Sequence, residues 1–254
     1  MLALERQKRI LELLSIEGSV MVSKLSIELG VTEETVRRDL EKLESKEMLR
    51  RTHGGAIPMD EGSYEFSLEK RKALNVEAKM ALARKAVQYI ATGDSIFLDA
   101  STTTFYMAKE LKTMKNITVI TNSIRIINEL SGIEGIKVIA VGGIVSNNQS
   151  FVGSMTENSI KNNYFADKMF FSSRGIGENS MILEGNEQEC FIKQSMHKNS
   201  KVHYYLCDKS KIGRVGYMRL LSFENVEYLI TDSNNIEGSL KETLDEFNVK
   251  IISV

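Results

Sequence analysis

From residue 95 onward, short apolar runs alternate with longer stretches of helical periodicity, and this alternation limits the possible fold more than any other feature of the sequence. Short apolar runs are typical of buried strands, and the intervening stretches repeat their apolar positions with the period of a helix. Strands that alternate with helices build a largely parallel sheet with helices on both faces and right-handed crossovers. The sequence therefore predicts a Rossmann-like α/β domain, with strands at 95–98, 118–121, 137–141, 168–171, 202–207, 228–231 and 250–254 and helices at 103–112, 124–130, 155–163, 188–197 and 236–247.

The first 57 residues have a different pattern, with three short helical segments. Residues 4–17 repeat apolar positions at helical spacing, a second segment ends at Gly30, and a third spans residues 33–46. Thr32 precedes the third segment and is a good N-cap, because its hydroxyl can accept a hydrogen bond from a free backbone N–H group. Three short helices in this order predict a small helix-turn-helix module ahead of the α/β domain.

The third helix of this module has one apolar face and one polar face. Val36, Leu40 and Leu43 recur at intervals of four and three, so they face the core. At about 100° per residue, Glu34 and Arg38 point away from it, and such a polar face suits the major groove of DNA. The residues of this helix and its cap that we predict to contact DNA are Thr32, Glu34, Thr35, Arg37, Arg38 and Lys42.

A basic segment and a Gly-Gly pair follow the third helix, and together they predict a β-hairpin wing. The cations and the hydroxyl group of this segment can hold phosphates or enter the minor groove. The predicted wing contacts are Arg50, Arg51, Thr52 and His53, which come directly before Gly54-Gly55.

Charge leaves a second interpretation of this module open. Residues 1–56 contain ten Lys and Arg and ten Asp and Glu, and the whole chain has a net charge of −1, so the total charge does not indicate nucleic-acid binding. Glu34 with Arg38, and Arg37 with Glu41, also have the i,i+4 spacing of pairs on any solvated helix. On pattern alone, a helical protein-interaction module is the alternative to DNA binding.

Polar and glycine residues follow the predicted strands, at the edge of the sheet where ligands of such folds bind. Hydroxyls and free N–H groups at a helix start cradle an anion, and a Gly-Gly pair lets the backbone approach a ligand closely. Each feature alone also fits an ordinary cap, turn or solvated side chain, but together they suit a phosphate with an attached polyol. The predicted ligand-binding residues are Asp99, Ser101, Thr102, Thr103, Thr104, Thr121, Asn122, Ser123, Gly142, Gly143, Arg174, Gly175, Glu187 and Lys211.

Two stretches of the first module resemble the DeoR family of bacterial repressors. Residues 30–40 read Gly-Val-Thr-Glu-Glu-Thr-Val-Arg-Arg-Asp-Leu, and residues 50–56 read Arg-Arg-Thr-His-Gly-Gly-Ala. Both runs and their separation match that family. The resemblance implies that the third helix reads the major groove and that residues 50–56 form the wing.

The α/β domain is similar to the sensor domain of the same family, which resembles sugar-phosphate isomerases such as ribose-5-phosphate isomerase. The matching runs are residues 97–104, 119–123, 142–143, 151–153 and 208–213. The resemblance implies a phosphate cradle at residues 101–104, with Lys211 at the position of an isomerase lysine.

Two departures from the family pattern lie in the same region. Ser101 stands where many relatives have glycine, which narrows the implied cradle, and Ser172-Ser173-Arg174 replaces a Gly-Ala-Asp run. The identity of the sugar therefore does not carry over from the family.

The rest of the sequence excludes several classes of protein. Cys190 and Cys207 have no CxxC or metal-ligand spacing, the charged N-terminus does not match a signal peptide, and no apolar run approaches the roughly 20 residues of a membrane helix. We expect a cytoplasmic protein without a metal, a cofactor or a membrane segment.

The junction between the two parts contains the only proline, Pro58. It predicts a DNA-binding domain at 1–57, a linker at 58–74 and a sensing and oligomerisation domain at 75–254. A helical pattern with few breakers also runs over residues 66–90.

Two functions from different classes fit these observations. The first is a transcriptional repressor without catalytic residues, whose partners are operator DNA, a phosphorylated sugar or sugar alcohol, and further copies of itself in a dimer or tetramer. The second is a sugar-phosphate isomerase with an added DNA module, in which Asp99, Glu187 and Lys211 would supply the acid–base chemistry. The family resemblance favours the repressor.

Overall fold

The computed structural model describes residues 2–17, 19–46, 48–57 and 68–254, and their contacts divide the chain into two compact units. Unit 1 is Met1–Val76 and unit 2 is Glu77–Val254. Most of the linker predicted at 58–74 lies outside the described residues, and helix α4 (Leu68–Ala73) falls in its remainder. The domain bounds that the sequence suggests stay a prediction.

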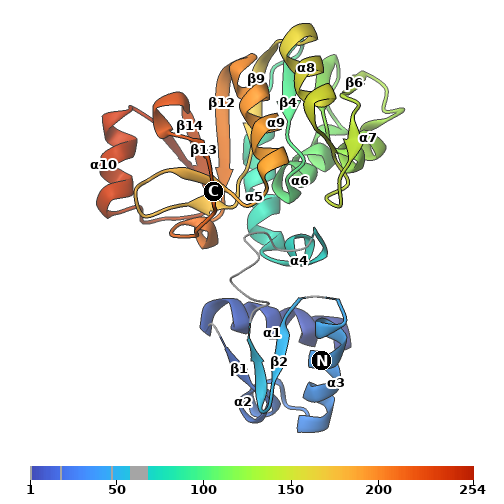
Figure 1. The fold of residues 1–254 in the computed structure, drawn as a ribbon, viewed down its shortest axis with the longest axis vertical. Helices are drawn as coiled ribbons and strands as arrows, with labels where there is room; N and C mark the ends of the chain where they lie inside the picture. Colours follow the sequence, from blue (N-terminus) through green and yellow to red (C-terminus); the bar gives the residue numbers. More distant parts are fainter. Residues whose placement is uncertain (1, 18, 47, 58–67) are drawn as a thin grey trace. The chain divides into compact units, whose positions relative to one another are not determined.

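Three helices form the body of unit 1: α1 (Ala3–Glu17), α2 (Val22–Leu29) and α3 (Glu33–Glu44) (Figure 1). They pack around an apolar cluster that includes Ile10, Leu25, Val36, Leu40 and Leu43. The predicted core face of α3 is confirmed, because its three apolar residues are at most 2% exposed.

Local backbone chemistry fixes the turn between α2 and α3. Gly30 ends α2 in the left-handed region with a φ of 63°, a conformation that glycine adopts without strain. The hydroxyl of Thr32 accepts a hydrogen bond from the backbone N–H of Thr35, so Thr32 caps α3 as the sequence predicts. The start of α3 is therefore set by its own sequence.

A three-stranded antiparallel sheet completes the winged helix-turn-helix. Its strands are β1 (Val20–Met21), β2 (Arg50–Thr52) and β3 (Gly55–Ile57), in the order β1-β3-β2. The predicted hairpin is present, but its turn is His53-Gly54 and not the Gly-Gly pair. Gly55 lies in β3, where a Cβ atom would come within 1.9 Å of the carbonyl oxygen of Val20, so β1 leaves no room for a side chain there.

The prediction of one long helix over residues 66–90 is wrong in one respect, because the described residues of this segment form two helices. α4 ends at Ala73, and α5 (Val76–Val87) begins after Asn75. Asn75 has a φ of 52°, and a left-handed residue interrupts the helical hydrogen-bond ladder. Asparagine enters this region more readily than most residues, but the apolar periodicity around it gives no sign of the break.

Seven parallel strands form the main sheet of unit 2, in the order β15-β14-β12-β9-β4-β5-β6 (Figure 1). All seven predicted strands are confirmed. The order changes direction where β9 pairs with β4, and the carboxyl ends of strands at such a point form a ligand crevice. The strands are β4 (Ser95–Leu98), β5 (Ile117–Thr121), β6 (Ile136–Ala140), β9 (Ala166–Phe171), β12 (Ser200–Cys207), β14 (Tyr228–Thr231) and β15 (Lys250–Ser253).

Helices cover both faces of this sheet, as the alternating sequence predicts. Alternate residues of β4 show the two layers: Ile96 and Leu98 pack into one apolar cluster, and Phe97 packs into the other. The first cluster contains residues of α5, α6 (Thr102–Leu111) and α7 (Ile124–Leu130). The second contains residues of α8 (Ser154–Asn163), α9 (Glu187–Lys198) and α10 (Gly238–Glu246).

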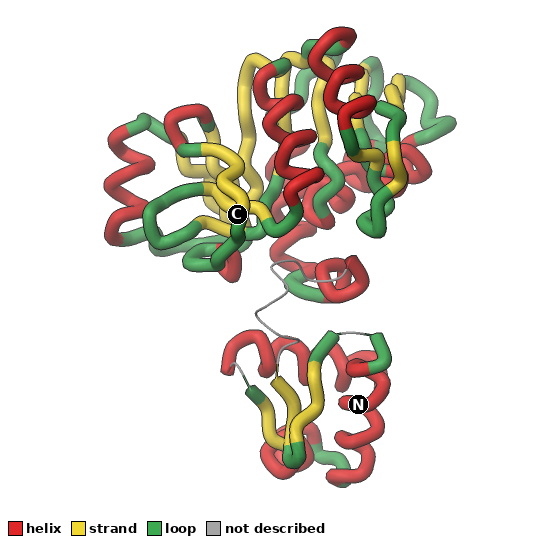
Figure 2. The backbone as a smooth tube through the Cα atoms, in the orientation of Figure 1, coloured by secondary structure: helices red, strands yellow, loops and turns green. Residues whose placement is uncertain are grey.

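Two small antiparallel sheets, which the sequence does not predict, complete unit 2 (Figure 2). Their strands have only two to four residues, too few for a recognisable alternation of polar and apolar side chains. One sheet pairs β7 (Ile144–Val145) with β8 (Phe151–Val152), and the other joins β10 (Gly175–Ile176), β11 (Ile182–Glu184) and β13 (Met218–Leu221). Among the described residues, no helix combines the length and the apolar character needed to cross a membrane.

Candidate nucleic-acid interface and ligand site

The polar face of α3 is open to solvent. The Arg38 side chain is 72% exposed and that of Arg37 is 50% exposed. Thr32, Glu34 and Lys42 are exposed as well, and Thr35 is half-buried beside the cap. The structure therefore brings the residues predicted on this helix together on one accessible surface.

Glutamates one turn earlier on α3 hold its two exposed arginines. Arg38 lies 3.4 Å from Glu34, as its spacing suggests. Arg37 pairs with Glu33 at 2.6 Å, and not with Glu41 as the i,i+4 pattern suggested. Exposed pairs of this kind contribute only about 0.3–0.5 kcal/mol, so a phosphate or a base edge can displace the glutamate at small cost.

The predicted wing residues Arg50, Arg51, Thr52 and His53 are all exposed, on β2 and its turn. Two glutamates of α3 connect this helix to the wing. The backbone N–H of Arg51 donates to the Glu44 carboxylate at 2.8 Å, and its guanidinium lies 3.9 Å from Glu41. The wing and the helix are thereby positioned together.

Asp39, a buried acid that was not among the predicted site residues, fixes α3 to α1. The Asp39 carboxylate accepts a hydrogen bond from the Arg6 guanidinium and another from the Gln7 amide at 3.0 Å. Asp39 is 2% exposed and Arg6 is 9% exposed. The sequence could have indicated that Asp39 is buried, because Asp39 lies between Val36 and Leu40 on the apolar side of an amphipathic helix.

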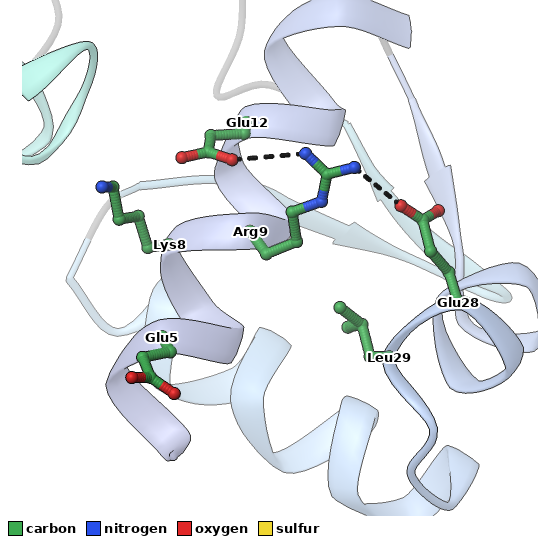
Figure 3. A pocket seen from close by; sticks show the side chains of 6 residues that line it. All are labelled: Glu5, Lys8, Arg9, Glu12, Glu28 and Leu29. Carbon is green, nitrogen blue, oxygen red and sulfur yellow. Dashed lines mark hydrogen bonds and ion pairs between the residues drawn. The ribbon is translucent and has the colours of Figure 1, made fainter. Parts of the chain in front are cut away.

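A surface cleft of about 420 Å³ lies between α1 and α2 (Figure 3). The Arg9 guanidinium reaches across it and pairs with Glu12 at 3.4 Å and with Glu28 at 3.1 Å. Arg9, Glu12 and Glu28 thus satisfy one another, and the pair of Arg9 with Glu28 connects the two helices. Its lining contains none of the predicted DNA-binding residues and consists of Glu5, Lys8, Arg9, Glu12, Glu28 and Leu29.

In unit 2, the predicted ligand residues gather at the carboxyl ends of neighbouring parallel strands. Asp99 follows β4, Asn122 follows β5 and Ser172 follows β9, and these strands are adjacent. The backbone N–H of Ser172 donates to Asp99 at 3.3 Å, so the ends of β4 and β9 are in direct contact.

The predicted phosphate cradle is the start of α6. Ser101 is its N-cap and accepts a hydrogen bond from the backbone N–H of Thr104. The Thr104 hydroxyl donates to the Asp99 carboxylate at 2.8 Å. Thr103 is fully buried, and its hydroxyl has no hydrogen-bond partner among the residues that the structure describes.

Arg125 of α7 supports this cradle from behind. Its guanidinium donates to the carbonyl oxygens of Ala100 at 3.0 Å and Ser101 at 3.4 Å, and it lies over the ring of Phe105. Arg125 is 7% exposed, so this positive charge lies directly beneath the loop that starts α6. It was not among the predicted residues, because an arginine on a short helix usually faces solvent.

Lys211 follows β12, in the short helix Lys209–Lys211, and its ammonium lies at the same sheet edge. It donates to the Ser172 hydroxyl at 2.5 Å and lies 3.9 Å from the Asp208 carboxylate. Burial alone would raise the pKa of Asp208, but Lys211 and a hydrogen bond from Ser210 hold it below its usual value. Lys211 and Asp208 are therefore a charged pair, with the ammonium directed at the end of β9.

A second lysine, Lys193 of α9, joins the strand ends from the other side and was not predicted. Its ammonium lies 3.2 Å from Asp99, pairs with Glu184 of β11 and donates to the carbonyl of Ser172 at 2.9 Å. Burial would lower the pKa of Lys193, but the surrounding carboxylates raise it above its usual value, so the lysine stays charged. In the sequence, Lys193 follows apolar residues within a predicted helix, and nothing there indicates that its side chain is buried at the strand ends.

Two of the three predicted glycines pack closely against the protein, whereas a Cβ atom on the third, Gly142, would meet nothing within 4 Å. A Cβ atom on Gly143 would come within 1.9 Å of the Thr156 hydroxyl, which donates to the carbonyl of Gly142. A Cβ atom on Gly175 would come within 2.6 Å of the carbonyl oxygen of Lys211. At Gly143 and Gly175, other parts of the chain therefore occupy the space beside the backbone.

The remaining predicted residues have structural partners of their own. Thr121 donates to the carbonyl of Leu98 at 2.7 Å, and Ser123 caps α7. The half-buried Arg174 donates its backbone N–H to Leu183, and Glu187 is exposed on the first turn of α9. Whether these four side chains contact a ligand stays a prediction.

An exposed winged helix-turn-helix, together with a parallel-sheet domain that gathers polar groups at its carboxyl edge, defines a class of protein: DNA-binding regulators that respond to a small molecule. Residues 6–61 match the DeoR-like helix-turn-helix domain, and residues 74–233 match the DeoR C-terminal sensor domain. The chain belongs to the DeoR family of transcriptional regulators, and its family assigns it a regulatory and not an enzymatic function.

Its relatives share nearly the whole length of the chain. It is 40% identical to the uncharacterized HTH-type transcriptional regulator YulB of Bacillus subtilis, over 100% of this chain and 98% of that protein. It is 32% identical to the lactose phosphotransferase system repressor of Staphylococcus epidermidis, over 98% of each chain. Among solved structures, ribose 5-phosphate isomerase A of Methanocaldococcus jannaschii is similar over 54% of this chain and 55% of that one, with 16% identity and a TM-score of 0.41.

Proposed function

We propose that this regulator represses a carbohydrate-metabolism operon and that a phosphorylated sugar or sugar derivative controls its binding to operator DNA. The observation that carries the effector assignment is that the α6 start and Lys211 lie at the same sheet edge, connected through Asp99 and Ser172. Hydroxyls, free N–H groups and an ammonium are the donors that a phosphate dianion prefers. The name of the staphylococcal relative, a lactose phosphotransferase system repressor, agrees with a sugar-linked role.

The same proposal includes the oligomeric state of the regulator and the cellular compartment in which it acts. One winged module has a small footprint, and repressors usually gain specificity by placing two modules on paired half-sites. We propose a dimer or tetramer held together by unit 2 and acting on DNA in the cytoplasm. The effector changes DNA binding only to the extent that it prefers one arrangement of the assembly.

The DNA-binding assignment predicts different results for two arginines. Arg38→Ala should weaken operator binding by about 1–3 kcal/mol and relax base preference, because an exposed arginine on the recognition helix can form a bidentate contact with guanine. Arg51→Ala should weaken binding to every sequence and lower the salt dependence by about one ion, because a wing cation contacts phosphate. Fluorescence anisotropy with specific and random duplexes, at several salt concentrations, measures both effects.

Arg84→Ala is the matched control, because Arg84 is an exposed arginine on α5 with a surface glutamate partner. It should bind both duplexes like the parent protein. If Arg38→Ala and Arg51→Ala also bind operator like the parent at physiological salt, the assigned DNA face is incorrect.

The effector assignment predicts a stability effect that depends on the phosphate group. A phosphorylated sugar at 100 times its dissociation constant should add about 2.7 kcal/mol to the stability of the folded state. For a domain of this size the melting temperature should rise by roughly 5–10 °C, and the unphosphorylated sugar should have much less effect. Thr102→Val removes a hydroxyl from the cradle and Lys211→Met removes the ammonium, so each variant should lose most of the shift.

Two substitutions near the same helix serve as controls for this measurement. Thr113→Val changes an exposed threonine just beyond α6, and Lys109→Met changes a lysine on the α6 surface. Both should keep the full ligand-induced shift. An undiminished shift in Thr102→Val and Lys211→Met would mean that the effector binds elsewhere.

A further inference from the structure

Glu189 of α9, one helical turn before Lys193, places its carboxylate at the same edge of the sheet. Glu189 is 5% exposed, and its carboxylate accepts a hydrogen bond from the Ser150 hydroxyl and another from the Asn122 amide at 3.4 Å. Ser150 in turn shares a hydrogen bond of 2.7 Å with Ser146. Glu189 therefore lies at the end of β5, next to the strand that leads into the cradle.

Two buried polar atoms at this edge of the sheet have no hydrogen-bond partner among the described residues. The Asn122 amide group donates to Glu189 and to the carbonyl of Phe151, but its Oδ1 atom is buried and accepts no hydrogen bond from the described part of the chain. The second such atom is the Thr103 hydroxyl in the neighbouring cradle. Buried polar atoms without a partner are uncommon in proteins, so each of them calls for an explanation, such as a functional role.

Charge divides this sheet edge into two different parts. The Glu189 carboxylate faces the end of β5, and Asp99 and Glu184 pair with the Lys193 ammonium. Lys211 follows β12, two strands from β4 on the other side, and its ammonium donates to Ser172. A phosphate at the α6 start is attracted by Lys211, whereas the hydroxyl groups of a sugar would find an acceptor in Glu189 at the end of β5.

We propose that Glu189 and the Oδ1 atom of Asn122 form a hydroxyl-recognition subsite that binds the sugar part of the phosphorylated effector. This inference rests on the proposed function. It assigns specificity to a residue other than Glu187, which lies on the same helix but is exposed. It also explains why Asn122 is left with a free acceptor: a sugar hydroxyl can donate to Oδ1 and to the Glu189 carboxylate.

Probes that share a phosphate but differ in hydroxyls test this subsite. D-Ribose 5-phosphate, D-glucose 6-phosphate and D-sorbitol 6-phosphate carry hydroxyls, and n-pentyl and n-hexyl phosphate do not. Calorimetric titration of the full chain should show that at least one sugar phosphate binds more tightly than the alkyl phosphate of equal length. Glu189→Gln should reduce that ratio about tenfold or more, because the sugar hydroxyl would lose its acceptor and stay buried with an unsatisfied hydrogen bond.

The companion variants separate recognition from folding. Asn122→Ala should reduce the same ratio, which keeps the test valid if Glu189→Gln does not fold. Both variants should bind the alkyl phosphates like the parent, because the cradle and Lys211 are unchanged. Glu246→Gln makes the same chemical change on the exposed surface of α10 and should keep the full ratio.

Each contrary result has a distinct meaning. The proposed hydroxyl subsite is wrong if Glu189→Gln and Asn122→Ala keep the parent's ratio, or if only Glu187→Gln reduces it. It is also wrong if the parent does not distinguish sugar phosphates from alkyl phosphates. In each of these cases the proposed phosphate cradle is unaffected. If no phosphate binds to the parent, the proposed function fails and the subsite fails with it.

Discussion

Lys193→Met is expected to destabilise unit 2 by about 3–5 kcal/mol, because removing one partner of a buried ion pair leaves an uncompensated charge. Asp99 and Glu184 would remain buried without their shared ammonium, and the carbonyl of Ser172 would lose its donor. At roughly 2–4 °C per kcal/mol for a domain of this size, the melting temperature should fall by about 6–20 °C. Thermal and urea unfolding of the full chain measure the loss.

A double-variant cycle tests whether the loss arises from charge. Glu184→Gln removes one of the stranded carboxylates, so Lys193→Met with Glu184→Gln should cost less than the sum of the two single changes. Lys161→Met is the control, because Lys161 forms an exposed i,i+4 pair with Glu157 and should change stability by less than about 1 kcal/mol. Strictly additive losses in the cycle would show that Lys193 acts by packing and not by neutralising the carboxylates.

Asp39→Ala should abolish operator binding, although Asp39 lies on the buried side of α3. The change removes the carboxylate that pairs with the buried Arg6 guanidinium and an acceptor from Gln7, at a cost of about 3–5 kcal/mol. A small unit has little stability in reserve, so α3 should lose its fixed position against α1. Amide hydrogen exchange should show reduced protection in α1 and α3, and the operator affinity should fall in parallel.

Two further variants distinguish a buried ion pair from a DNA contact. Glu28→Ala breaks the exposed pair with Arg9, which also connects two helices, and should cost less than about 1 kcal/mol. Arg6→Met with Asp39→Leu replaces the buried pair by apolar side chains and should restore most of the stability and the operator binding. If the double variant is stable but does not bind DNA, the buried pair has a direct role in recognition.

The main architecture could be predicted because its signals are local and strong. Strands such as β4 and β14 are buried on both faces of the sheet, so their sequences are continuous apolar runs. The caps at Thr32 and Gly30 follow from the chemistry of single residues. The short sheet of β10, β11 and β13 depends on pairing between distant segments, and the break at Asn75 is a single left-handed residue, so neither leaves a periodic pattern in the sequence.

The candidate site was predictable as a place but not as a set of side chains. The carboxyl ends of parallel strands meet at one edge, which is why the structure brings Asp99, Asn122 and Lys211 to the same side of the sheet. The choice between Glu187 and Glu189 depends on the rotation of α9, because two residues along a helix turn the side chain by about 200°. Only the packed structure shows which carboxylate faces the strand ends.

The order of the main sheet has a consequence for synthesis on the ribosome. β4 is the first of its strands to be made; β5 pairs with β4 and β6 with β5, and later β9 pairs with β4, β12 with β9, β14 with β12 and β15 with β14. Every newly made strand therefore finds its partner already present, and none has to wait for a later segment or insert between two strands that are already paired. This order of addition limits the time for which an unpaired apolar edge awaits its neighbour, the condition under which parallel sheets aggregate.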